Sequence, residues 1–259
     1  WDRAIAYADS VLQVKPNLLD LNTVGWGTPR SPESLSVYAT GTPDEVIWMR
    51  EGYRELGDMQ ASDPCYMVSD ELLDLYGSCN QTMVQQKTIR DIRGCLYFAW
   101  NFKMGFPSVT YYRSFLSIGG SDNGVYQGIR TAEMYLNRAE GYIRKYMAGG
   151  DASYCRKALN DLNELRRHRF NNKYTYEEVD ITDPDDLFEF YQEERRRELA
   201  GDWMHRWCDL RRYGMPEISH TLFETASGNK TEATLQKNRY VLPIAEEVIR
   251  LNPRLEQNK

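Results

Sequence analysis

The stretch RTAEMYLNRAEGYIRKYMAGG, residues 130–150, runs directly into DASYCRKALNDLNELRRHRF, residues 151–170. In the first stretch, apolar residues recur at helical spacing until Gly149 and Gly150 end the pattern (Ala132, Tyr135, Leu136, Ala139, Ile143 and Tyr146). In the second, Asp151 is a suitable N-cap, and the apolar positions are Ala158, Leu159, Leu162 and Leu165. Two amphipathic helices joined by a few residues predict an αα-hairpin.

A second pair of helical segments follows, DPDDLFEFYQEERRRELAG at 183–201 and DWMHRWCDLRRYG at 202–214. The small residues Ala139 and Ala158 lie where helices in close contact need them, so the hairpins resemble tetratricopeptide repeats. The first hairpin spans about 40 residues, longer than the ~34 residues of that repeat. The sequence therefore predicts a mostly α fold of degenerate tetratricopeptide-like hairpins, with irregular loops and a few short strands.

The stretch from Glu193 to Gly214 contains six arginines and two tryptophans, a pattern found in nucleic-acid-binding stripes and in catalytic patches. Its carboxylates nearly cancel the positive charge, and helical spacing pairs Glu193 and Glu194 with Arg197 and Asp202 with Arg206. Each exposed pair of this kind contributes about 0.2–0.5 kcal/mol. These charges therefore predict a structural role in solvent-exposed pairs.

An apolar stripe crosses the same stretch. Leu199, Trp203, Trp207 and Leu210 follow one another at helical spacing. The two tryptophans are thus predicted to point inward, where they cannot stack on a nucleic-acid base.

Composition and motifs exclude several classes of function. The chain carries 32 basic and 38 acidic residues, a net charge of −6, which argues against nucleic acid as a partner. Its five cysteines show no metal-ligand spacing with the three histidines, and no catalytic or phosphate-binding motif is present. We therefore predict a protein that is not an enzyme and has no cofactor, no metal site and no catalytic residue.

The first half of the chain mixes helices, loops and strands. A helix is predicted over the first 15 residues, a loop over 21–43, a strand at 45–49 and irregular structure over 50–68. Ser69 is the N-cap of the next helix, which Gly77 ends, and residues 95–100 are predicted to form a strand. Trp48 and Trp100 lie in the strand-like segments and are predicted to be core residues.

Several segments together resemble the SusD/RagB family, in the order in which that family has them. They are AIAYADSVLQ, DEVIW, SDELLDLYG, RTAEMYLNRAEGY, ALNDLNELRRHR, ERRRELAGDWMHRWCDLRRYG and YVLPIAEEVIRLNPRLEQN. The resemblance implies a single SusD-like domain over 1–259 that corresponds to the C-terminal half to two-thirds of a family member. Residues 1–129 would form a helix and a loop-rich ligand side, and residues 130–259 the helical hairpins and the C-terminal tail. The N-terminal part, with its signal peptide and lipidated cysteine, would be absent.

The resemblance also implies a function. Family members are lipid-anchored on the extracellular face of a Bacteroidetes-type outer membrane, capture oligosaccharides or polysaccharides and deliver them to a SusC-like TonB-dependent transporter. Two alternatives stay open: a RagB-like binder that captures peptides, and a protein–protein adaptor built on the tetratricopeptide-like hairpins.

Candidate ligand residues follow from their position in this family. The segment MREGYRELGDMQASDPCYMV, residues 49–68, lies between the expected strand and the helix that begins after Ser69. Tyr53 and Tyr66 are expected to stack against the apolar face of a sugar ring. The polar residues expected to bind hydroxyl groups are Arg50, Arg54, Asp58, Gln60 and Asp63. Trp26, flanked by glycines in VGWGTP, is the other aromatic residue expected at the ligand.

Overall fold

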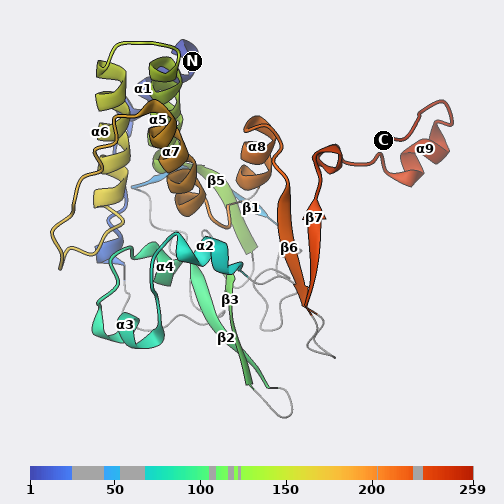
Figure 1. Cartoon of the computed structure of the whole chain (residues 1–259), viewed down its shortest axis with the longest axis horizontal. Helices are drawn as coiled ribbons and strands as arrows, with labels where there is room; N and C mark the ends of the chain where they lie inside the picture. The colour runs from blue at the N-terminus through green and yellow to red at the C-terminus, as the bar shows by residue number, and fades with distance from the viewer. Residues whose placement is uncertain are drawn as a thin grey trace. The chain divides into compact units, whose positions relative to one another are not determined.

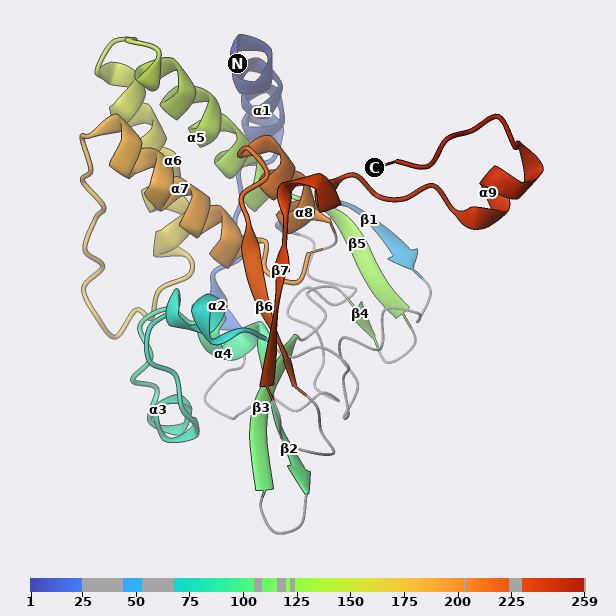
Figure 2. The ribbon, with the colours of Figure 1, turned by 45° about the vertical axis from the view of Figure 1, so that its right-hand side comes forward.

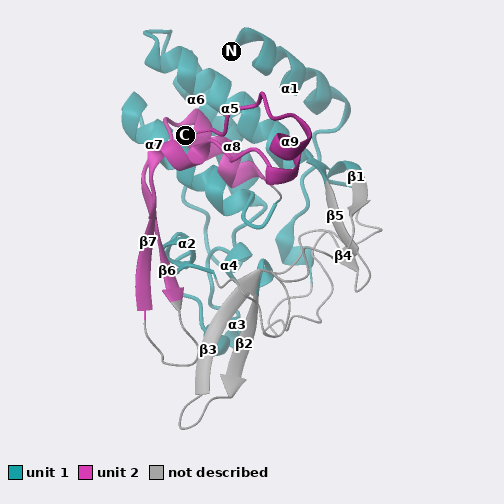
Figure 3. Cartoon of the chain, turned by 90° about the vertical axis from the view of Figure 1, so that its right-hand side faces the viewer, with its two compact units in different colours: residues 1–203 teal, residues 204–259 magenta. Residues whose placement is uncertain are grey.

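The computed structural model of the protein (Figure 1) describes residues 1–24, 44–52, 68–104, 109–115, 120–121, 124–202, 204–223 and 230–258. The chain forms two compact units, residues 1–203 and residues 204–259, which Figure 3 colours separately. No helix within these described ranges is long and apolar enough to cross a membrane.

Four helices form the helical layer of the first unit: α1 (Asp2–Val14), α5 (Thr131–Met147), α6 (Ser153–Arg167) and α7 (Pro184–Glu198). Helix α5 lies among the other three and contacts each of them (Figures 1 and 2). Most of the predicted inward positions are confirmed, because seven of these side chains in the α5–α6 hairpin are fully or nearly fully buried (Ala132, Leu136, Ala139, Ile143, Ala158, Leu162 and Leu165). Tyr135 and Tyr146, also predicted on this face, are only partly buried. The N-cap of α6 is Ala152 and not Asp151 as predicted, but Asp151, one residue earlier, accepts a hydrogen bond from the N–H of Ser153 at 2.7 Å. The hairpin and the mostly α fold are therefore as predicted.

Gly141 allows α1 and α5 to approach closely. A Cβ atom at this position would lie 2.6 Å from Cγ1 of Ile5, far inside van der Waals contact. We expect Gly141→Leu to lower the free energy of unfolding by about 1–3 kcal/mol, because the side chain forces α1 away from α5. Urea unfolding measures this loss. The double variant Ile5→Ala, Gly141→Leu, in which the neighbouring side chain is truncated, should lose less free energy of unfolding than the sum of the two single variants. Additive losses would contradict the close contact.

The strands of the first unit form two small antiparallel sheets. One has the order β1 (Val46–Gly52), β5 (Gly124–Arg130) and β4 (Gly120–Ser121), and the other pairs β2 (Phe98–Met104) with β3 (Val109–Phe115). The predicted strand at 45–49 is confirmed as part of β1. The prediction that Trp48 is a core residue is wrong, since its side chain is 57% exposed. β1 is an edge strand whose register shifts between Val46 and Trp48, so alternation along the strand does not set the direction of this side chain.

Short helices lie between β1 and β2: α2 (Asp70–Asp74), α3 (Gln81–Gln86) and α4 (Arg93–Leu96). Ser69 caps α2 as predicted, and Gly77 has the left-handed conformation of a helix stop, with φ at +74°. The strand predicted at 95–100 is wrong in its first part. Cys95 and Leu96 end α4, and both are buried, so their apolar character reflects a buried helical turn.

The second unit contains α8 (His205–Arg212), the hairpin of β6 (Ile218–Phe223) and β7 (Lys230–Leu235), and α9 (Glu246–Leu251). Trp207 stacks on Tyr240 with ring centroids 5.1 Å apart, and Leu210 is buried. The inward orientation predicted for Trp207 is thus confirmed, whereas Trp203 lies outside the described residues. Because α7 ends at Glu198 and α8 begins at His205, the four-residue apolar stripe does not lie on one continuous helix.

Four charged residues of α7 are buried, which corrects the prediction of solvent-exposed pairs for this part of the helix (Glu194, Arg195, Arg197 and Glu198). Glu194 pairs with Arg197 at 2.8 Å as predicted, but its side chain is completely buried and also pairs with Arg93 and Arg166. Asp202 pairs with Arg130 at 2.8 Å. The reason lies in the tertiary structure, because four arginines from other segments pair with the carboxylates of Glu194 and Glu198 (Arg93, Arg130, Arg166 and Arg169).

These groups form what we call the buried charge network (Glu45, Asp91, Arg93, Arg130, Arg169, Glu194 and Glu198). At its centre, Glu198 accepts hydrogen bonds from Arg130 at 2.9 Å and from Arg93 at 3.0 Å. Arg169 donates to both oxygens of Glu198 and both oxygens of Glu45 at 2.9–3.0 Å. The network joins the segment before β1, helix α4, the end of β5, the end of α6 and helix α7.

Candidate ligand-binding site

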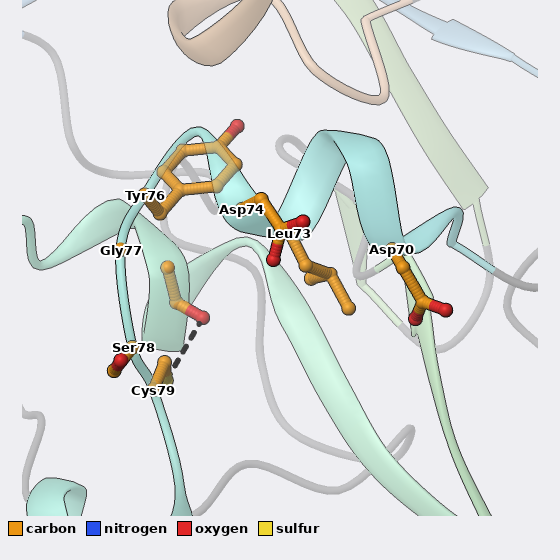
Figure 4. Close-up of a pocket in the computed structure, with 8 residues that line it drawn as sticks. Asp70, Leu73, Asp74, Tyr76, Gly77, Ser78 and Cys79 are labelled. Atoms are coloured by element: carbon orange, nitrogen blue, oxygen red, sulfur yellow. Dashed lines mark hydrogen bonds between the residues drawn. The ribbon is translucent and has the colours of Figure 1, made fainter.

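A pocket of about 500 Å³ opens beside α2 in the first unit (Figure 4). Its described lining residues come from α2, from the turn that follows it and from α4 (Asp70, Leu73, Asp74, Tyr76, Gly77, Ser78, Cys79 and Gly94). The volume lies within the ~300–1,000 Å³ range of pockets that bind small ligands. It is therefore a candidate binding site.

The local sequence explains how α2 presents its polar face to the pocket. The side chain of Ser69 accepts a hydrogen bond from the N–H of Leu72 at 3.3 Å, which fixes the start of the helix. Leu72 is buried on the opposite side, in the core cluster. Asp70, Leu73 and Asp74 are spaced three and four residues apart, so they share the face that lines the pocket.

Tyr76 and Gly94 form the wall between the pocket and the core. The Tyr76 hydroxyl donates to the carbonyl oxygen of Arg197 at 2.7 Å, and its ring meets Phe98 edge-on at 5.3 Å. Burial raises the pKa of Tyr76 well above its ordinary value, so this hydroxyl stays a neutral donor. A Cβ atom on Gly94 would lie 3.0 Å from Cβ of Tyr76, so a larger residue at this approach of α4 to the turn would require Tyr76 to shift by a few tenths of an ångström.

The polar groups at the pocket can bind a ligand through hydrogen bonds. Asp70 and Asp74 offer carboxylate acceptors, and Ser78 offers a hydroxyl that both donates and accepts. The Cys79 thiol lies 3.4 Å from the carbonyl oxygen of Gly94, the contact drawn in Figure 4. Within the described ranges, no three His, Cys, Asp or Glu side chains group in a way that could hold a metal ion. The arrangement fits a ligand rich in hydroxyl groups.

Most ligand residues predicted from the sequence lie outside the described residues, namely Trp26, Tyr53, Arg54, Asp58, Gln60, Asp63 and Tyr66. Arg50 lies in β1, where its backbone pairs with Gln127 of β5. The assignment of these residues to a ligand therefore stays a prediction. In the sequence, Tyr66 precedes Asp70 by four residues.

The sequence reasoning did not identify Asp70, Asp74 and Ser78. A signal was present, because the helix after Ser69 carries two aspartates four residues apart and leaves them on one face. What the sequence could not indicate is that this face borders a pocket, since its depth depends on the approach of α4 to the turn.

The fold was compared with solved structures. A SusD-like protein from Bacteroides fragilis superposes with a TM-score of 0.62 at 16% identity, covering 98% of this chain and 60% of that one. A SusD-like carbohydrate binding protein from Bacteroides vulgatus superposes with a TM-score of 0.55 at 17% identity, covering 98% of this chain and 55% of that one. The chain thus spans 55–60% of the length of these two structures, and at this identity the likeness concerns the fold.

The sequence itself was compared with curated proteins and with protein families. No curated protein matched. The sequence model of the SusD family matches residues 110–259, which include the hairpin of α5 and α6 and the whole second unit. The chain therefore belongs to the SusD family.

Proposed function

We propose that the protein captures glycans, and that the Asp70–Gly94 pocket and the segment 49–68 together bind the sugar. Membership of the SusD family supports this proposal most directly, and one of the structures with the same fold is a carbohydrate binding protein. The pocket adds a chemical reason: Asp70, Asp74 and Ser78 provide acceptors for the hydroxyl groups of a sugar. Tyr53 and Tyr66 would provide the aromatic face that the described lining of the pocket lacks at its surface.

The proposal includes a place and a partner. As a SusD-family protein, it would act as a lipid-anchored protein at the extracellular face of the outer membrane and pass oligosaccharides to a SusC-like TonB-dependent transporter. Co-purification from outer membranes with a TonB-dependent transporter tests this part. Recovery of the protein without any transporter would refute the delivery step and leave glycan capture standing.

Isothermal titration with plant and host polysaccharides, and with a peptide mixture beside them, tests the capture itself. We expect saturable binding of at least one glycan. Binding of peptides alone would identify a RagB-like peptide binder. If neither glycans nor peptides bind and the protein still co-purifies with a partner, the adaptor function is the correct one.

The site is tested with the glycan that binds in this titration. We expect Tyr66→Ala and Tyr53→Ala to weaken binding by roughly tenfold each, because each removes a stacking surface. Asp74→Asn should weaken it by about three- to tenfold, since a carboxylate acceptor becomes a neutral amide. Tyr7→Ala is the matched control, because Tyr7 is an exposed tyrosine on α1 that lines neither described pocket. Unchanged affinity in all three site variants would refute the site and not the capture of glycans.

A further inference from the structure

A second pocket, of about 140 Å³, lies where the connector after α6 folds back on the segment before α4. Its wall includes Arg90, Arg166, Phe170, Tyr174, Tyr176 and Glu177, and it shares no described lining residue with the Asp70–Gly94 pocket. It is smaller than the ~300–1,000 Å³ of sites for drug-sized ligands. Its size suits a single ring rather than an extended chain.

The backbone beneath this second pocket is rigidly held. The N–H of Asn171 donates to the carbonyl oxygen of Arg90 at 2.8 Å, and Phe170 forms a β-bridge with Asp91. The buried side-chain amide of Asn171 donates to the carbonyl oxygens of Lys87 at 3.0 Å and Ile89 at 2.8 Å. The pocket is therefore formed before any ligand arrives, which reduces the entropy cost of binding.

Aromatic side chains supply the apolar part of the wall. Phe170 and Tyr176 meet edge-on, with ring centroids 5.4 Å apart. Tyr174 remains 36% exposed, and its hydroxyl donates to the carbonyl oxygen of Thr88 at 3.3 Å, which fixes the ring. Arg166 lies over the Phe170 ring, 4.6 Å from its centroid, so Tyr174, the most exposed of the three rings, is the one that can offer apolar surface to a ligand at a small cost in conformational entropy.

Two charged groups of opposite sign complete the wall. The Arg90 guanidinium lies 5.4 Å from the ring centroid of Tyr174, and Glu177 is exposed. Neither of them forms an ion pair with another residue in the described part of the chain. Arg166, by contrast, forms an ion pair with the buried Glu194, which also pairs with Arg93 and Arg197. Arg90 and Glu177 thus offer one strong donor and one strong acceptor of opposite charge.

We propose that this second pocket binds one neutral sugar residue, separately from the Asp70–Gly94 pocket. A pyranose ring has apolar C–H faces that suit aromatic side chains, and its hydroxyl groups can accept from Arg90 and donate to Glu177. An acidic sugar would be attracted by Arg90 and repelled by Glu177, and an amino sugar the reverse, so a charge on the ligand brings no net electrostatic gain. A purely apolar ring would leave both charged groups without new partners.

Ligand-observed NMR titration of the protein with methyl β-D-glucopyranoside, methyl β-D-galactopyranoside and methyl α-D-mannopyranoside tests the proposal. D-Glucuronate and D-glucosamine serve as the charged probes. We expect at least one neutral probe to bind, and Tyr174→Ala and Arg90→Gln each to weaken it by about tenfold. Tyr174→Phe keeps the ring and should retain binding. The matched controls are Tyr7→Ala and Arg3→Gln, which alter an exposed arginine–tyrosine stack on α1 with a separation of 5.6 Å.

Each possible result of the titration either supports or overturns the proposal. Binding that is equally strong in wild type, Tyr174→Ala and Arg90→Gln would overturn the proposal, because the sugar would then occupy another site. The proposal would also be overturned if no neutral probe binds. The same holds if glucuronate or glucosamine binds more tightly than the neutral probes and Tyr174→Ala abolishes that binding. Arg90→Gln changes an exposed side chain without an ion pair in the described part of the chain, so it remains informative if Tyr174→Ala loses the fold.

Discussion

The Glu198→Gln variant is expected to lose about 3–5 kcal/mol of its free energy of unfolding, the cost of breaking a buried ion pair on one side. The Glu198 carboxylate is fully buried and accepts hydrogen bonds from Arg93, Arg130 and Arg169. A glutamine side chain keeps the shape but removes the negative charge, and its amide N–H groups face guanidinium donors. Three buried arginines then retain fewer carboxylates to balance them.

Urea unfolding measures this loss, and Glu193→Gln is the matched control. Glu193 pairs with Arg197 at 2.7 Å from the same helix, but its side chain is 43% exposed. Its replacement should change the free energy of unfolding by less than about 1 kcal/mol. Equal effects of the two substitutions would show that the buried charge network does not hold the segments together. Should Glu198→Gln fail to fold, Glu45→Gln tests the same network through its pairs with Arg130 and Arg169.

Acid should unfold the first unit through this network. Burial by itself raises the pKa of Glu198, but the guanidinium groups of Arg169, Arg130 and Arg93 outweigh burial and hold the pKa at about 2. The carboxyl of Glu194 behaves alike: burial is outweighed by Arg93, Arg166 and Arg197, so its pKa lies well below the ordinary value. In the unfolded chain, both groups regain pKa values near 4.5.

The sign of the effect follows from proton uptake. Between about pH 5 and pH 2 the unfolded chain binds protons that the folded chain does not, so the stability supplied by these carboxylates is present above pH 5 and is lost as the pH falls. For Glu198 alone, the shift corresponds to about 3 kcal/mol. At higher pH, Asp161 has the opposite effect on the free energy of unfolding, because burial outweighs its pair with Arg138 and raises the pKa of Asp161 to about 6.

Urea unfolding at a series of pH values isolates the contribution of Glu198 to the free energy of unfolding. The difference between wild type and Glu198→Gln cancels the contribution of Asp161, and this difference should shrink by about 3 kcal/mol between pH 5 and pH 2. A difference that stays constant over this range would contradict the assignment of a depressed pKa to Glu198.

Local sequence patterns were sufficient for the long helices α1, α5, α6 and α7 and for the N-cap of α2. The helical spacing of apolar residues in α5 and α6 predicted that Leu136 and Leu165 lie in the core, and Ser69 marked the start of α2. Both features depend only on residues within a few positions of one another. The patterns failed at Trp48 and Cys95. There, side-chain direction depends on an irregular strand pairing and on a single buried helical turn, neither of which leaves a periodic signal.

The candidate site was only partly predictable for the same reason. The sequence led to the segment before α2, but Asp70 and Asp74 border a pocket only because Gly94 lets α4 approach the turn at Tyr76. In the second pocket, Arg90 and Tyr174 are 84 residues apart in the chain. Their meeting depends on the hydrogen bonds of Asn171.

By itself, the sequence determined the class of the protein: amphipathic hairpins, SusD-family segments in order, and charges that nearly balance along residues 193–214. Only the tertiary structure decided what those charges do. Helical spacing pairs Glu194 with Arg197, but it cannot reveal that Arg93, Arg130 and Arg169 converge on Glu198 from three other segments. The physical reason is that the energy of a charge depends on its burial and its partners, and both are properties of the folded chain.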